Sequence, residues 1–195
     1  MQRFVIAGLL AIGFAAPASA ELPVGQIAPG FTAEAAKAGK RFEFSLSAEL
    51  KKGPVVLYFF PEALTGECLI ENYEFSDVVP RVKAAGATLI GMSKDSIETL
   101  ELSSVLECSN RLPLAADPQL GVIRAFGAES AQKPGQAGSV SFVIAPDQRI
   151  IYTRTNPDSD PVNHARETVD ALEKWRAEQA SASVVPESFT GDPGR

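Results

Sequence analysis

Residues 55–60, VVLYFF, are six apolar side chains in an unbroken row. The side chains of a strand point alternately to the two faces of its sheet, so a strand that is apolar at every position is buried on both faces. Such a strand lies inside a sheet that other elements cover on both sides. The segment therefore favours a fold in which helices pack against both faces of a sheet.

The rest of the chain alternates between strand-like and helix-like segments. Strands are predicted by the apolar patterns at residues 41–46, 88–93, 140–144 and 150–154, with a short one after Leu112 and Pro113. Helices are predicted at residues 68–85, 97–108, 121–126 and 162–179. This order predicts an α/β fold with a mixed β-sheet flanked by helices on both faces. Active sites of such sheets lie at the carboxyl ends of strands, and Cys68 follows the VVLYFF strand in that zone.

The chain begins with a pattern that is typical of a secretory signal peptide, MQRFVIAGLLAIGFAAPASA. Arg3 makes a short basic start, residues 4–16 are apolar, and the small residues at 18–20 form a cleavage site. The apolar stretch is too short to span a bilayer, and the three-part pattern disfavours the alternative, a buried first helix. We therefore expect residues 1–20 to be removed on export to the periplasm.

The mature chain is acidic. The formal net charge of −6 becomes −7 without residues 1–20, because Arg3 is lost and no acidic residue is. An acidic chain with no basic run has no electrostatic footprint for nucleic acid or for an anionic membrane. Its length suits one domain, expected at residues 21–179, and the small and polar residues 180–195 are expected to be a disordered tail.

The two cysteines, Cys68 and Cys108, allow two interpretations. In an exported protein, two cysteines alone favour a structural disulfide, and there is no CxxC motif. Cys68 is also placed in the first turn of a predicted helix, where unsatisfied N–H groups and the helix dipole stabilise a reactive thiolate. No cluster of residues resembles a zinc or iron site, and His164 is the only histidine.

The stretch PEALTGEC, which ends at Cys68, carries groups that suit a reactive thiol. Thr65 can aim its hydroxyl at whatever the sulfur attacks, and Pro61 can shield the sulfur from bulk water. Glu67 and Glu71 oppose this interpretation, because nearby negative charge raises the pKa of a thiol. A compensating cation is therefore expected.

These residues resemble the active-site motifs of peroxiredoxins. Pro61, Thr65 and Cys68 match the family pattern P-x-x-x-T-x-x-C. CLIENYEFSD, which begins at Cys68, is similar to the stretch found in the Q-type, or bacterioferritin comigratory protein, group. Further similarities follow in family order: GQIAPGFT at 25–32, GMSKDS at 91–96, LP at 112–113, DP at 117–118, FG at 126–127 and FVI at 142–144. The resemblance covers residues 24–178.

The resemblance implies a thioredoxin-like fold and thiol peroxidase activity without a metal, haem or flavin. Cys68 would be the peroxidatic cysteine, which a peroxide oxidises to a sulfenic acid. Thr65 would bond the peroxide and Pro61 would shield the sulfur. The substrates would be hydrogen peroxide and small organic hydroperoxides, a thioredoxin-like protein would be the reductant, and the protein would be a monomer or weak dimer.

The sequence departs from the family pattern at two positions. Tyr73 stands where many Q-type members carry a resolving cysteine, so the resemblance assigns resolution to Cys108, which would form an intramolecular disulfide with Cys68. The alternative is a buried, inert Cys108. Ser139 stands where the family has an arginine that stabilises the thiolate.

Three cations could replace that arginine or be solvated surface charges: Arg154, Lys133 and Arg124. Without such a cation, the chain could be a non-catalytic relative, a binding module with a permanent disulfide. A one-cysteine peroxidase is a third alternative. Near the C-terminus, His164 is interpreted as a solvated surface residue, and Trp175 as part of a core-facing stripe with Val169 and Leu172.

Overall fold

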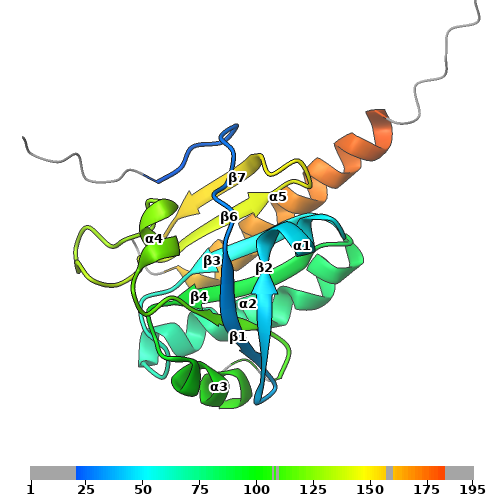
Figure 1. Cartoon of the computed structure of the whole chain (residues 1–195). Helices are drawn as coiled ribbons and strands as arrows, with labels where there is room; N and C mark the ends of the chain where they lie inside the picture. The colour runs from blue at the N-terminus through cyan, green and yellow to red at the C-terminus, as the bar shows by residue number, and fades with distance from the viewer. Residues whose placement is uncertain (1–20, 107, 109, 157–159, 183–195) are drawn as a thin grey trace, which may run out of the picture.

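The computed structural model describes residues 21–106, 108, 110–156 and 160–182, and it leaves out the side chains of Glu67 and Cys68. In this part of the chain, the strands form a seven-stranded sheet in the order β2-β1-β5-β4-β3-β6-β7 (Figure 1). The strands are β1 (Thr32–Lys37), β2 (Lys40–Ser45), β3 (Val55–Phe59), β4 (Thr88–Ser93), β5 (Leu114–Ala116), β6 (Val140–Ile144) and β7 (Ile150–Thr155). The helices are α1 (Leu46–Leu50), α2 (Gly66–Ala84), α3 (Ile97–Leu106), α4 (Gly121–Ala125) and α5 (Pro161–Ala182).

Strand β3, which contains most of the VVLYFF run, lies inside the sheet. It is parallel to β4, with Leu57 opposite Ile90, and antiparallel to β6, with Leu57 opposite Phe142. All five of its residues are buried. Farther out, β6 pairs antiparallel with β7, and β1 pairs antiparallel with both β5 and β2. The sheet is therefore mixed, as predicted.

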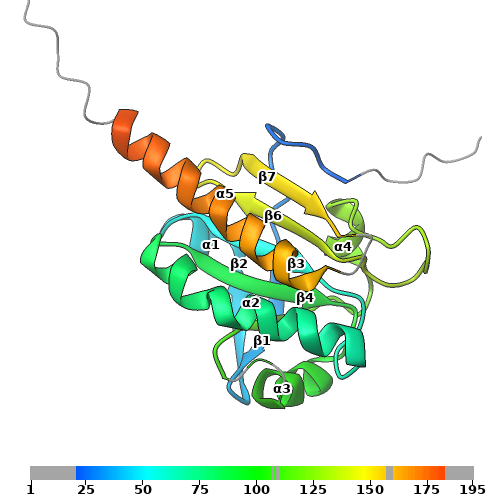
Figure 2. The same ribbon diagram turned by 180° about the vertical axis from the view of Figure 1, so that it is seen from behind.

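Alternate side chains of β3 enter two separate hydrophobic cores. Leu57 and Phe59 pack in one core with residues of α1 and α4. Val56 and Tyr58 pack in the other with residues of α2, α3 and α5. Figure 2 shows α2 and α5 side by side across this second face. The prediction of helices on both faces is confirmed.

The inner face of α2 differs from the sequence-based expectation. The sequence pattern predicts that Leu69, Tyr73 and Val82 share the inner face of this helix, but Leu69 and Tyr73 are 49% and 55% exposed. Asn72 and Ser76 are buried instead, with Val82 still in the core. The hydroxyl of Tyr58 donates to Asn72, and Ser76 donates to a backbone carbonyl at 2.7 Å. Polar residues occupy the inner face because each finds a hydrogen-bond partner there, which hydropathy alone does not reveal.

Most of the element boundaries lie within a few residues of the predictions. Strands β4 and β6 have the predicted bounds, whereas β1 and α1 were not predicted. Helix α5 continues to Ala182, three residues into the stretch expected to be disordered. Val169 and Leu172 are buried in it as expected, but Trp175 is only partly buried.

The expected signal peptide at residues 1–20 lies outside the described residues, as do residues 183–195 of the expected tail. Within the described residues, none of the helices combines the length and the apolar character that crossing a membrane requires.

Candidate active site

Asp95 holds the loop that leads from β3 to α2. Its Oδ2 accepts a hydrogen bond from the backbone N–H of Ala63 at 2.8 Å and another from the hydroxyl of Ser93 at 2.7 Å. The backbone N–H of Phe60 also donates to the carbonyl of Met92 at 3.1 Å. The carboxyl ends of β3 and β4 therefore fix the start of the PEALTGEC stretch.

Thr65 is the N-cap residue of α2. Its backbone is extended, with φ −107° and ψ 154°, and its hydroxyl donates to the carbonyl of Glu62 at 3.1 Å instead of capping the helix. The hydroxyl oxygen therefore keeps acceptor capacity for another donor. Leu64, just before it, has a left-handed φ of 60°, which turns the chain into the helix.

Cys68 is the third residue of α2, so its backbone lies in the first helical turn, as predicted. The first N–H groups of a helix have no partner within the helix, and the positive end of the helix dipole lies there. The predicted roles of Thr65 and Pro61 toward the sulfur concern the side chain of Cys68, which lies outside the described part of the structure.

A cavity of about 600 Å³ lies beside the first turns of α2. The predicted residues Pro61 and Thr65 line it together with Glu71 and Ser139, so the structure brings these four residues to one place. The remaining lining residues are Glu62, Gly66, Ile70, Lys133, Gln136, Asn156 and Pro161.

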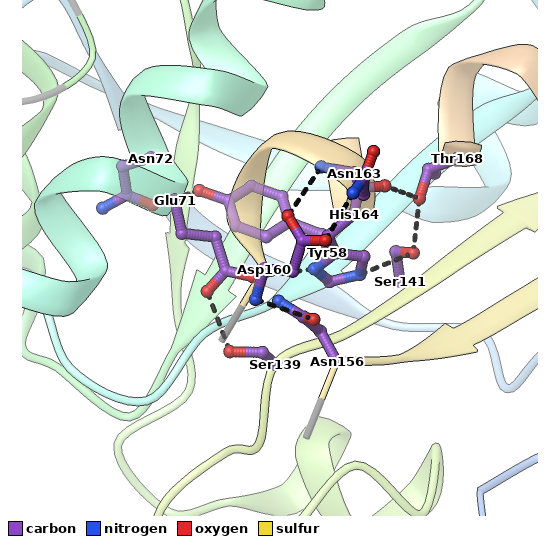
Figure 3. Close-up of polar contacts among 10 residues, drawn as sticks. All are labelled: Tyr58, Glu71, Asn72, Ser139, Ser141, Asn156, Asp160, Asn163, His164 and Thr168. Carbon is purple, nitrogen blue, oxygen red and sulfur yellow. Dashed lines mark hydrogen bonds and ion pairs between the residues drawn. The ribbon is translucent and has the colours of Figure 1, made fainter. Parts of the chain in front are cut away.

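Glu71 makes its polar contacts through both carboxylate oxygens. The hydroxyl of Ser139 donates to Oε2 at 2.8 Å, and Nδ1 of His164 lies 2.7 Å from Oε1 (Figure 3). Ser139, which stands at the sequence position of the family arginine, therefore contacts Glu71. Glu71 is 5% exposed, so these contacts lie largely away from water.

The interpretation of His164 as a surface residue was wrong. Its side chain is fully buried between Glu71 and Ser141, and its ring meets Phe75 edge-on at a centroid distance of 5.2 Å. Nε2 lies 3.0 Å from the hydroxyl of Ser141. A polar residue in the first turn of an amphipathic helix is usually solvated, but here a carboxylate of α2 and a hydroxyl of β6 provide partners.

The N-terminus of α5, which carries His164, is fixed by a cap. Asp160 precedes the helix and accepts a hydrogen bond from the backbone N–H of Asn163 at 3.2 Å, and Pro161 occupies the first helical position. The side chain of Asn163 also donates to Asp160, and these bonds hold the pKa of Asp160 below its usual value. Asn156 accepts from the N–H of Asp160 at 3.2 Å.

Of the three candidate cations, Lys133 is the one that lines the cavity. Arg124 pairs with Glu129 at 2.9 Å, and this contact holds the pKa of Glu129 below its usual value. Glu129 also accepts from the N–H of Gly135 at 2.8 Å, so Arg124 helps to brace the loop that carries Lys133. Arg154 of β7 pairs with Glu167 of α5.

Cys108 is fully buried in the core shared by α2, α3 and α5. Its carbonyl accepts the hydroxyl of Ser76 at 2.7 Å. Ser76 follows Cys68 by two turns of α2, which is about 12 Å along the helix axis. Within the described residues, no three histidine, cysteine or acidic side chains are grouped so as to hold a metal ion.

Sequence reasoning missed the roles of His164, Asp95 and Asn156. Asp95 lies in the GMSKDS motif, so its position was visible but its hydrogen bond to the loop was not. His164 and Thr168 are spaced one helical turn apart beside the apolar stripe of α5, which is the signal that could have indicated burial.

The chain is similar to a known protein family and to named proteins of other organisms. The family model described as AhpC/TSA family matches residues 24–153. YkuU of Bacillus subtilis (strain 168), which is named as a peroxiredoxin, is 34% identical over 141 residues, covering 68% of this chain and 78% of YkuU. The bcp protein of Helicobacter pylori (strain ATCC 700392 / 26695), also named as a peroxiredoxin, is 33% identical over 155 residues, covering 78% of this chain and 99% of bcp.

The fold of the chain is also similar to that of a solved structure. The crystal structure of peroxidoxin BcpB from Mycobacterium tuberculosis matches with a TM-score of 0.67 and 25% sequence identity. The match covers 77% of this chain and 96% of BcpB.

Proposed function

Because the chain belongs to the AhpC/TSA family and is a peroxiredoxin, a thiol-dependent peroxidase with a thioredoxin-like fold, we propose that Cys68 is its peroxidatic cysteine. One observation carries this assignment. Cys68 lies in the first turn of α2, and Gly66 and Glu71 of that helix line the cavity together with Pro61 and Thr65. A thiol at this place benefits from the helix dipole and from unpaired backbone N–H groups.

The proposed reaction is attack of the Cys68 thiolate on one oxygen of the peroxide. The S–O bond forms as the O–O bond breaks, so sulfur loses the two electrons that the peroxide gains. The departing hydroxide or alkoxide takes up a proton and leaves as water or an alcohol, and Cys68 becomes a sulfenic acid. Thr65 hydrogen-bonds the peroxide through its hydroxyl, and Pro61 covers the sulfur.

We propose that Cys108 resolves this sulfenic acid. The thiol of Cys108 attacks the sulfenic sulfur, water leaves, and a Cys68–Cys108 disulfide forms. The link from Cys108 to Ser76 attaches Cys108 about two helical turns along α2 from Cys68, whereas a disulfide needs Cα atoms within ~7 Å. The first turns of α2 or the end of α3 must therefore unwind locally, after which the dithiol of a thioredoxin-like protein reduces the disulfide.

The substrates that we propose are hydrogen peroxide and small organic hydroperoxides. A cavity of about 600 Å³ has room for a small organic group beside the peroxide. The signal-peptide pattern of residues 1–20 supports export to the periplasm, and we propose a monomer or weak dimer by analogy with Q-type relatives.

Peroxide consumption with dithiothreitol as reductant tests the assignment of the two cysteines. Cys68→Ser is expected to lose the activity, whereas Cys108→Ala is expected to keep it because dithiothreitol can reduce the sulfenic acid directly. Activity in Cys68→Ser that equals the parent would remove Cys68 from the reaction. With thioredoxin as the reductant, loss of turnover in Cys108→Ala supports the resolving role, and full turnover assigns a one-cysteine cycle.

A further inference from the structure

A chain of hydrogen-bonded side chains runs from the cavity into the core. Ser139 donates to Glu71, Glu71 contacts Nδ1 of His164, and Nε2 of His164 contacts Ser141 at 3.0 Å (Figure 3). The hydroxyl of Ser141 lies 2.7 Å from that of Thr168, and Thr168 also contacts the carbonyl of His164 at 2.8 Å. His164, Ser141 and Thr168 are fully buried.

The proton positions along this series of hydrogen-bonded side chains follow from counting hydrogens. A carbonyl can only accept, so the single hydroxyl hydrogen of Thr168 goes to the carbonyl of His164. Thr168 must then accept from Ser141, which commits the single hydroxyl hydrogen of Ser141. Ser141 can therefore only accept from the ring, and Nε2 of His164 carries a hydrogen.

The same count fixes the net charge of Glu71 and His164. Nδ1 and Oε1 lie 2.7 Å apart, so a proton must lie between them; otherwise two lone pairs would face each other in a buried site. If the proton is on Nδ1, the pair is an imidazolium and a carboxylate. If it is on Oε1, the pair is a neutral imidazole and a carboxylic acid. The net charge is zero in both cases.

We propose that His164 is a positioning residue of the peroxidase site, which shares a proton with Glu71 and so cancels the negative charge that Glu71 would otherwise place beside Cys68. The proposal rests on the proposed role of Cys68. Glu71 follows Cys68 by three positions in α2, so the two residues are neighbours on the helix surface. The histidine thus provides the compensation that the resemblance assigns to an arginine at the position of Ser139.

Without the shared proton, the pair would carry one net negative charge, which disfavours the thiolate. The other charged or titratable groups on the surrounding elements are the same whether or not Glu71 and His164 share the proton. They are Tyr58 on β3, Arg154 and Tyr152 on β7, Asp160 and Glu167 on α5, and Glu62 and Lys133 at the cavity. Arg154 lies opposite Ser141 in the β6–β7 register, but it is paired with Glu167.

Nitrogen-15 NMR of the histidine ring tests the proton count directly. His164 is the only histidine of the chain, so the ring signals of a tag-free protein need no assignment. We expect a protonated Nε2 at neutral pH, with a hydrogen-bonded proton shared between Nδ1 and Glu71. A ring with a bare Nε2 and a hydrogen only on Nδ1 would overturn the proposal. This measurement uses the unmodified protein, so it does not depend on a variant that folds.

The pH dependence of Cys68 alkylation by iodoacetamide tests the effect on the thiol. In a Cys108→Ala background Cys68 is the only thiol, and its alkylation rate follows the thiolate fraction. His164→Asn keeps a donor for Glu71 but cannot ionise, so we expect the pKa of the Cys68 thiol to rise by about one unit or more. Adding Glu71→Gln, or Ser139→Arg, to His164→Asn is expected to lower that pKa again.

A merely structural role of His164 gives different results. The thiol pKa in His164→Asn would then be unchanged, or it would stay raised after Glu71→Gln and Ser139→Arg are added, and either result overturns the proposal. Failure of the proposed function appears elsewhere, as a peroxide rate no faster than that of free cysteine. The alkylation and NMR readouts do not require peroxidase activity, so the two failures are distinguishable.

Discussion

The carboxylate of Asp95 accepts a hydrogen bond from the backbone N–H of Ala63 at 2.8 Å, across 32 positions of the chain. It joins the end of β4 to the loop after β3, and the same oxygen accepts the hydroxyl of Ser93. The loop leads directly to Thr65 and α2. The geometry around Cys68 therefore depends on a residue outside the PEALTGEC stretch.

Asp95→Ala is expected to slow the reaction with hydrogen peroxide by about tenfold or more, because a hydrogen bond to a charged acceptor contributes roughly 1.5–3 kcal/mol. Stopped-flow measurement of the second-order rate constant checks this. Asp147→Ala is the matched control, since Asp147 also accepts a backbone N–H, that of Arg149, in the turn between β6 and β7. Equal rates in the two variants would contradict a role for Asp95 in holding the loop.

Lys133→Ala is expected to slow the reaction of a hydroperoxide that bears a carboxylate more than that of hydrogen peroxide. Lys133 is a cation at the cavity, and it attracts an anionic substrate. Rate constants for both peroxides at low and high salt measure the effect, which salt should weaken. Lys52→Ala, which removes an exposed lysine paired with Glu49, is the control. An equal loss for both peroxides would argue against charge recognition.

Asp160→Ala is expected to lower the melting temperature at neutral pH, because it removes the cap of α5. The folded-state pKa of Asp160 is depressed, so its contribution is present above the unfolded-state pKa and is lost as pH falls through the folded-state value. The difference between parent and variant should therefore shrink on acidification. Thermal melts followed by circular dichroism across this range check the sign, and a difference that grows with acid would contradict it.

Cys108→Ala is expected to trap the oxidised protein as a sulfenic acid. Without a second thiol, the sulfenic acid at Cys68 has no intramolecular partner and remains open to dimedone. Mass spectrometry after one equivalent of hydrogen peroxide should find the dimedone adduct on Cys68 in the variant and little of it in the parent. Equal labelling of the two proteins would show that Cys108 does not resolve the intermediate.

Strands with strong local patterns could be predicted from the sequence. Strand β4 and strand β6 have the predicted bounds because their apolar runs are buried in the interior of the sheet. Strand β1, TAEAAK, was missed because alanine and glutamate have little strand preference. Its strand conformation comes from pairing with β2, the next strand of the chain, and with β5, which is distant in sequence.

The candidate site could be predicted only where its residues are close in sequence. Pro61, Thr65 and Cys68 form one local motif, and the structure places the first two at one cavity beside α2, whose first turn contains the third. The contact between Glu71 and His164 joins residues 93 positions apart. A buried histidine needs hydrogen-bond partners, and Glu71 is a partner that only the folded chain brings to His164.

The intact mass of the fully reduced mature protein, measured before and after one equivalent of hydrogen peroxide, tests whether Cys68 reacts with peroxide and then forms a disulfide with Cys108. We expect loss of two hydrogens in the parent, from a Cys68–Cys108 disulfide, and no change in Cys68→Ser. Gain of oxygen on Cys68 would keep the peroxidatic role and contradict resolution by Cys108. No change in the parent, on the timescale of a free-cysteine control, would contradict the assignment of Cys68 as the peroxidatic thiol.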